Sequence, residues 1–312
     1  MTSTTVPLAA TPSTRGPFRL AIGVLAVTAL TVVKGAMTTS TGSGLAFRDW
    51  PTSDGGFMPE RSLTTVPGFL EHFHRLAGGT VGLLSLALAL WLHFGRLGDR
   101  RVRACAWFGG CFVLAQGLVG GTHVLKGLPV LTGVVHATFA QLIFATFAWI
   151  AYQLTDRHRT TAPVTTAAPG AGRRIAMTAL AILVVQTVFG AVARHSNSAH
   201  ALWTHVGNSF VVFVIGTIAT AFATGKLGQI PGIRPLANWI VGLLVLQIAL
   251  GFVVLAIRPA QGKQPENVAN LTTASVISLH VLIGASLTML VALLAAHVFR
   301  GTRRAGPQDA VA

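Results

Sequence analysis

The chain has 312 residues, of which 52% are hydrophobic and only 10% are charged, and its mean hydropathy is +0.65. A soluble domain carries about 25% charged residues, so this composition excludes a soluble globular protein and indicates an integral membrane protein. The formal net charge of +15 does not indicate a nucleic-acid partner. The basic residues lie in short loops between apolar runs, as membrane topology requires.

The first 18 residues are rich in Thr, Ser and Pro, which predicts a disordered cytoplasmic tail. Beyond this tail the sequence contains eight apolar runs, each close to the roughly 20 residues that span a bilayer. The expected spans are residues 19–40, 69–94, 104–125, 130–153, 174–195, 201–224, 236–257 and 272–299. No cleaved signal peptide is expected, because the first run is long and many more follow it. The fold class is therefore expected to be all-α and integral to the membrane.

A linker at residues 154–173, rich in Thr, Ala and Pro, divides the spans into two halves of four. The halves, residues 19–153 and 174–299, are expected to form two pseudo-symmetric four-helix bundles, with a cytoplasmic tail at residues 300–312. A spacing repeated near the outer ends of the odd-numbered spans supports an internal duplication. It comprises Gln116 with Gly120, Gln186 with Gly190, Gln247 with Gly251 and, as a counterpart in the first span, Thr31 with Gly35. Helix packing through small residues is the alternative explanation.

The basic residues also predict the orientation of the chain. Of the 23 Lys and Arg residues, fifteen lie in segments on the side of both termini and six on the opposite side. The positive-inside rule therefore places both termini in the cytoplasm and the segment from about Thr41 to Gly68 outside. We expect a multi-pass protein of the cell (inner) membrane.

Four histidines occupy equivalent positions in the first turns of the even-numbered spans: His74, His136, His205 and His280. Every even span begins on the outer side, so all four are expected at similar depth. A small residue follows each histidine four positions later, on the same helix face: Gly78, Ala140, Ser209 and Gly284. Porphyrin iron takes axial imidazoles, and helix bundles build such sites from facing helices. We predict that each half holds one haem between its two histidines, because zinc or copper would require three or four close ligands.

Two charged residues lie beside the first of these histidines. Glu71 is three residues before His74 and shares its helix face. A charged side chain at a helix centre costs about 2.5–3.5 kcal/mol on insertion scales, so it is rare there without a function. Arg75 is a candidate partner for a haem propionate, with snorkelling to lipid headgroups as the alternative. For Glu71 the alternative is a structural pairing with Arg75 or His72 at the helix end.

The pattern Glu71-x-x-His74-Arg75, the preceding run Thr41–Leu45 with Asp49-Trp50-Pro51, and the paired histidines of two four-helix halves resemble the haem A synthase family. The resemblance covers about residues 19–299. It implies an oxidoreductase that converts haem O to haem A for cytochrome oxidase, by successive hydroxylation of one methyl substituent to a formyl group. It further implies that His74 and His136 ligate the substrate haem O, that His205 and His280 ligate a haem b cofactor, and that Glu71 is the catalytic acid/base group.

The implied partners are haem O synthase, the assembly of cytochrome oxidase, membrane lipid and an electron acceptor that the sequence does not identify; a homo-oligomer is compatible with the sequence. Two alternatives stay open, a di-haem cytochrome b that carries electrons in a quinol chain and a haem transporter or chaperone. Some bacterial family members carry a cysteine pair in the first outer loop, and this chain has none there. Its two cysteines, Cys105 and Cys111, lie in or beside the third span and are expected to be buried small side chains.

Overall fold

The computed structural model describes residues 13–160, 162–166, 169–258 and 269–304. Within these residues, eight helices are long and apolar enough to cross a membrane. They are α1 (Arg15–Ser40), α3 (Val66–Phe94), α4 (Arg100–Leu125), α5 (Val130–Gln153), α7 (Pro169–Ser196), α8 (Ala199–Leu227), α9 (Ile233–Ile257) and α10 (Leu271–Gly301). The prediction of an all-α membrane protein with eight spans is confirmed.

Four of the long helices begin at a polar side chain that accepts a hydrogen bond from the first turn. Thr65, Asp99, Ser198 and Asn270 cap α3, α4, α8 and α10 in this way. The capped helices start up to four residues before the apolar runs predicted from hydropathy. The same shift occurs at α1, where residues 15–18, expected in the N-terminal tail, are helical; residues 1–12 lie outside the described part of the chain.

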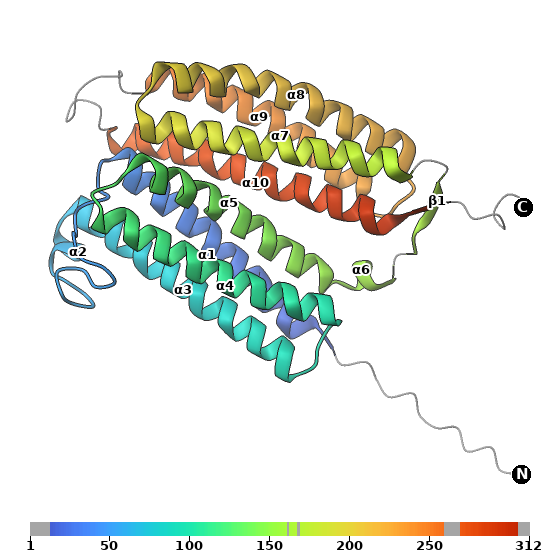
Figure 1. The fold of residues 1–312 in the computed structure, drawn as a ribbon, viewed down its shortest axis with the longest axis horizontal. Coiled ribbons are helices and arrows are strands. Elements are labelled where there is room, and N and C mark those ends of the chain that lie inside the picture. Colours follow the sequence, from blue (N-terminus) through green and yellow to red (C-terminus); the bar gives the residue numbers. More distant parts are fainter. Residues whose placement is uncertain (1–12, 161, 167–168, 259–268, 305–312) are drawn as a thin grey trace, which may run out of the picture.

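The eight helices form two bundles that lie side by side (Figure 1). Helices α1, α3, α4 and α5 make one bundle, called here the N-half, and α7 to α10 make the other, the C-half. Each half has its own buried apolar core, with Leu88, Phe147 and Ile150 in the N-half and Ile240 and Leu294 in the C-half. Contacts of α10 with α1 and α5, and of α5 with α7, join the two halves. The pseudo-symmetry of the halves stays a prediction.

Short elements close the two ends of the bundles. At one end, residues 41–65 connect α1 to α3 and include the short helix α2 (Arg61–Thr64). They are called here the outer segment, after the side of the membrane that the sequence predicts for them. At the opposite end, the linker contains α6 (Asp156–Thr160) and β1 (Val164–Thr166), which pairs in parallel with β2 (Thr302–Arg304) after α10. The linker and the start of the predicted C-terminal tail therefore contain regular structure, while residues 305–312 lie outside the described part.

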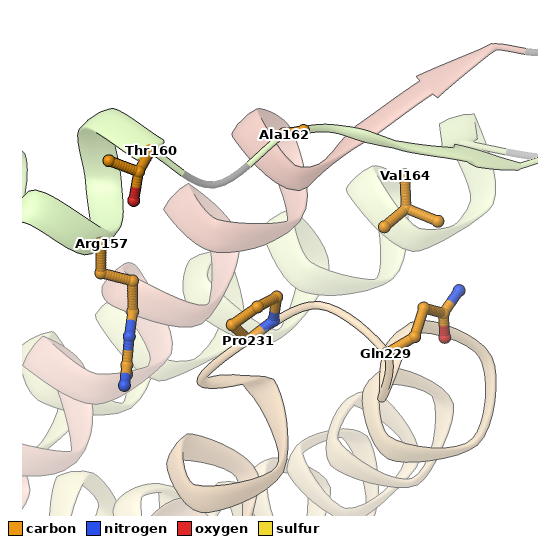
Figure 2. Close-up of a pocket in the computed structure, with 6 residues that line it drawn as sticks. All are labelled: Arg157, Thr160, Ala162, Val164, Gln229 and Pro231. Carbon is orange, nitrogen blue, oxygen red and sulfur yellow. The ribbon is translucent and has the colours of Figure 1, made fainter.

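A surface cavity of about 610 Å³ lies at the linker end (Figure 2). Its lining comes from α6, the linker and the α8–α9 turn, and comprises Arg157, Thr160, Ala162, Val164, Gln229 and Pro231. Burial, followed by the charge of Arg300, lowers the pKa of nearby His158 to about 4, so this imidazole is neutral at physiological pH. The cavity is at the opposite end of the bundles from the outer segment and is separate from the site described below.

The two cysteines differ from the expectation in one respect. Both are free, but only Cys105 is partly buried, whereas Cys111 is exposed on α4. The prediction of a buried side chain is therefore wrong for Cys111. The reason is helix geometry, because residues six apart on a helix point in different directions, and only one of the two faces the bundle.

Candidate functional site

The structure brings the four predicted ligands together as two pairs. The ring centroids of His74 on α3 and His136 on α5 are 6.3 Å apart, with ring planes at 82°. Those of His205 on α8 and His280 on α10 are 6.4 Å apart, with ring planes at 83°. Each pair is formed by the second and fourth long helices of its own half. The pairing predicted from sequence position is thus the pairing observed.

The spacing of each pair can be compared with that of two imidazoles on opposite sides of one metal ion. An imidazole nitrogen binds a metal at about 2.0–2.1 Å. A ring nitrogen lies about 1.1 Å from the centre of a five-membered ring whose bonds are about 1.3 Å long. The centres of two such rings are then separated by about 6 Å, which both observed pairs match. The spacing therefore fits bis-histidine coordination of a haem iron.

The ring nitrogens fit a ligand role as well. Nδ1 of His74 donates a hydrogen bond to the Thr31 carbonyl oxygen at 3.1 Å, which leaves the Nε2 lone pair for a metal, as second-shell contacts of metal-binding histidines do. Nδ1 of His136, His205 and His280 is buried without a hydrogen-bond partner among the described residues. Buried polar atoms are normally paired, so these three imidazoles are unusual in keeping one ring nitrogen without a partner among the described residues. In His280 the other ring nitrogen, Nε2, lies 3.3 Å from Nε2 of Gln247.

The small residues one turn beyond the histidines behave differently in the two halves. A Cβ added to Gly78, below His74, would meet no atom within 4 Å, so there is room beside this helix face. A Cβ added to Gly284, below His280, would lie 3.0 Å from Nε2 of Gln247. There is therefore open space next to the helix at Gly78 but not at Gly284, where the Gln247 side chain fills it.

Glu71 lies one turn before His74 and is almost completely buried, with 3% of its surface exposed. Its Oε2 accepts a hydrogen bond from the backbone N–H of Phe47 at 2.9 Å, and its Oε1 forms an ion pair with Nη2 of Arg75. The structural pairing that the sequence left as an alternative is present. It fixes the carboxylate in place, and a fixed carboxylate is compatible with a chemical role.

Arg75 has a role that the sequence did not reveal. Its Nη1 donates to the carbonyl oxygens of Asp49 and Thr52 at 2.7 and 2.6 Å, and its Nη2 donates to that of Phe47 at 2.9 Å. His72 adds a 2.9 Å hydrogen bond between its Nδ1 and Ser53 Oγ. One end of α3 therefore clamps residues 47–53 of the outer segment. Both terminal nitrogens of Arg75 are occupied, and its propionate role stays a prediction.

Sequence reasoning also missed residues that join the two halves next to these sites. Nη2 of Arg194, near the end of α7, donates to the Ala36 carbonyl oxygen at 2.6 Å and to Ser40 Oγ at 2.8 Å, both on α1. The neighbouring His195 has its ring centroid 5.8 Å from that of His123 on α4. These two histidines, one from each half, meet between the halves. Their pairing depends on how the bundles dock, and no local sequence signal reports that.

The fold and the site define an integral membrane protein of eight helices with two histidine pairs, one of which lies beside a buried carboxylate–guanidinium pair. The family model COX15-CtaA, described as cytochrome oxidase assembly protein, matches residues 18–212. This match covers more than half of the chain, including the N-half and His205. The chain therefore belongs to the COX15-CtaA family.

Comparison with individual proteins leads to the same family. The chain is 28% identical to the heme A synthase of Symbiobacterium thermophilum over 251 residues, which cover 72% of this chain and 81% of that one. It is 31% identical to the heme A synthase of Lysinibacillus sphaericus over 174 residues, covering 54% and 55%. It is also 31% identical to that of Bacillus licheniformis over 128 residues, covering 40% and 41%. The last two alignments span about half or less of those relatives.

Proposed function

We propose that this chain is a haem A synthase, a membrane oxidoreductase that oxidises a methyl substituent of haem O to a formyl group. Family membership and the relatives named heme A synthase support this assignment. The observation that carries it is the pair of matched histidine sites, at 6.3 and 6.4 Å, of which one alone has a buried carboxylate beside it. Two haem sites with one reactive environment suit an enzyme that holds one haem as substrate and another as cofactor.

The N-half is the proposed substrate site, with His74 and His136 as the ligands of haem O. Each oxidation of the methyl carbon releases protons as well as electrons, so the site needs a proton acceptor. Glu71 is the only Asp or Glu within the eight long helices. It lies one helical turn from His74, so its carboxylate would be near the edge of a haem held by that histidine, and general-base catalysis requires such proximity. Arg75 and the Phe47 N–H hold its two oxygens in position.

The C-half is the proposed cofactor site, with His205 and His280 as the ligands of haem b. A bound haem b supplies an iron that exchanges single electrons. The C-half helices contain no Asp or Glu. Beside the pair, Gln186 donates from Nε2 to the His205 carbonyl oxygen at 3.0 Å and accepts from Nδ2 of Asn208 at 2.8 Å. These side chains orient α7 against α8 and offer no proton acceptor of the strength of a carboxylate.

The pigment made by cells tests this function directly. The chain is co-expressed with a haem O synthase, and the haems are extracted and separated by reverse-phase chromatography. We expect haem A to appear only when both proteins are present. Extracts that contain haem O and no haem A would reject the synthase assignment and favour an electron-carrying cytochrome b or a haem transporter.

The orientation in the membrane is part of the same proposal. The excess of basic residues on one side supports cytoplasmic termini and an external outer segment, which places both histidine pairs near the external face. Reporter fusions after Ala312 and at Asp54 measure this, since a phosphatase reporter is active outside the cytoplasm. Phosphatase activity of the Ala312 fusion would contradict the orientation. Haem O synthase and the assembly of cytochrome oxidase are the proposed partners in the cell.

A further inference from the structure

A glycine lies against the ring of each of the four paired histidines. A Cβ added to Gly35, Gly120 or Gly190 would lie 2.7, 2.8 or 2.9 Å from Cε1 of His74, His136 or His205, respectively. A Cβ on Gly251 would lie 3.3 Å from Cε1 of His280. Contacts below 3.0 Å are essentially never made by real Cβ atoms. The first three rings therefore occupy space that any side chain at the glycine would take.

The residue one turn before each glycine contacts the same histidine. Nε2 of Gln116 donates to the His136 carbonyl oxygen at 2.9 Å, and Nε2 of Gln186 donates to that of His205 at 3.0 Å. On α1 the contact comes from the backbone and not from a side chain: the Thr31 carbonyl oxygen accepts a hydrogen bond from Nδ1 of His74. On α9, Nε2 of Gln247 is 3.3 Å from Nε2 of His280. Residues four apart share a helix face, so both contacts come from one face of the neighbouring helix.

General helix packing does not account for these contacts. A packing glycine allows two helix backbones to approach, whereas the nearest atoms to all four of these positions belong to an imidazole. Other glycines of the long helices show that this is specific. A Cβ on Gly23, Gly117, Gly207 or Gly242 would meet nothing within 4 Å. Gly133 on α5 also lies against imidazoles, because its Cβ would be 2.6 Å from Nδ1 of His195, but that ring belongs to neither ligand pair. Among the described glycines, close contact with a paired histidine occurs only at the four that have the four-residue spacing.

We propose that this spacing is a positioning device for the haem-ligating histidines, called here the histidine cradle. It comprises Thr31 with Gly35, Gln116 with Gly120, Gln186 with Gly190, and Gln247 with Gly251. The glycine lets the imidazole ring lie close to the neighbouring helix. The residue one turn before the glycine contacts the histidine and so fixes the position of the histidine along its helix axis and its rotation about that axis. The cradle residues are positioning residues, since they act on the ligand and not on the reacting atoms. Only the identity of the ligand as haem rests on the proposed function.

Matched Gly→Ala variants test the cradle in the intact protein. Gly120→Ala is compared with Gly117→Ala on the same helix, and Gly190→Ala with Gly207→Ala. Alanine is a better helix former than glycine, so the controls are expected to insert and melt like the parent or better. Gly190→Ala is expected to lose at least half of the bound haem b or to shift its reduction potential and low-spin electron paramagnetic resonance signal. Gly251→Ala, at the longer 3.3 Å contact, is expected to cause a smaller shift than Gly190→Ala.

A double-mutant cycle distinguishes ring contact from backbone packing, even where the single variant folds poorly. Gly190→Ala is introduced into a His205→Ala background, and thermal unfolding is followed by circular dichroism. If the glycine accommodates the ring, its substitution lowers the melting temperature only when His205 is present. An equal loss in both backgrounds, or a Gly190→Ala variant with parental haem content, potential and spectrum, would overturn the cradle. The result of the double-mutant cycle does not depend on which haem is bound. It can therefore be interpreted even if the synthase assignment is wrong.

Discussion

The N-half and the C-half present the same ligand geometry in different surroundings. Their histidine ring centroids are 6.3 and 6.4 Å apart, and their ring planes cross at 82° and 83°. Beside the N-half pair lie Glu71 and Arg75, which bind the outer segment. Beside the C-half pair lie the amides of Gln186 and Gln247 and the guanidinium of Arg194, and α7 to α10 contain no Asp or Glu. Under the proposed function, the buried carboxylate marks the N-half as the reactive site, and the C-half, which lacks one, holds the redox group.

The largest expected effects come from removing the histidines of one half at a time. His205→Ala and His280→Ala should abolish most of the tightly bound haem b, because a single axial imidazole remains. His74→Ala and His136→Ala should keep that haem and lose the conversion of haem O. Pigment content of the purified variants measures both, with exposed His200→Ala as the control. Equal loss of the same haem in all four variants would contradict the two-site comparison.

Glu71→Gln should affect the chemistry of the N-half and leave haem binding in both halves intact. Glutamine keeps an oxygen for the Phe47 N–H but cannot accept a proton, and general acid–base groups typically contribute about 10²–10⁴-fold in rate. We expect haem A formation to fall within that range, with haem O or a hydroxylated intermediate accumulating. The exposed Glu60→Gln is the control. Normal haem A yield from Glu71→Gln would make Glu71 a purely structural residue.

Arg75→Lys should loosen the outer segment over the N-half without changing the C-half. A lysine ammonium cannot reproduce the fork that binds three backbone carbonyls and a carboxylate. Each hydrogen bond to the charged group that is not remade costs about 1.5–3 kcal/mol. Amide hydrogen exchange should therefore accelerate in residues 47–53, while bound haem b stays at the parental level. Unchanged exchange in this segment would show that the clamp is not needed.

Lowering the pH is expected to have a smaller effect, a loss of stability in the outer segment of the N-half. Hydrogen bonds to the Asp49 carboxylate, above all from the Gly55 backbone N–H, lower its pKa from 3.8 to about 2. Because the folded pKa is the lower one, the unfolded segment binds more protons, and stability falls as the pH drops from about 4 to 2. The loss is about 1 kcal/mol or less, since solvent screens a partly exposed carboxylate. Exchange of the Asp54 and Gly55 amides against pH measures it, and Asp49→Asn should remove the dependence.

Hydropathy and residue spacing were sufficient to predict the eight spans and which of the four histidines lie together as pairs. A spanning helix has a length set by the bilayer and a composition set by the absence of water, so both can be read from adjacent residues. Counting along the spans also places the four histidines near the starts of α3, α5, α8 and α10. Helix starts were less accurate, because a cap such as Asp99 extends α4 beyond its apolar run.

The sequence did not determine which groups Arg75, Arg194 and Gly120 contact. Arg75 was expected to face a propionate, and it binds carbonyls of a segment more than twenty residues away. Arg194 reaches α1 of the other half, and Gly120 receives the His136 ring from the next helix. In each case the partner comes from another element, and its approach depends on how helices dock. Composition and hydrophobic periodicity show which residues lie on each helix. The packing of whole helices against one another decides which of those residues come into contact.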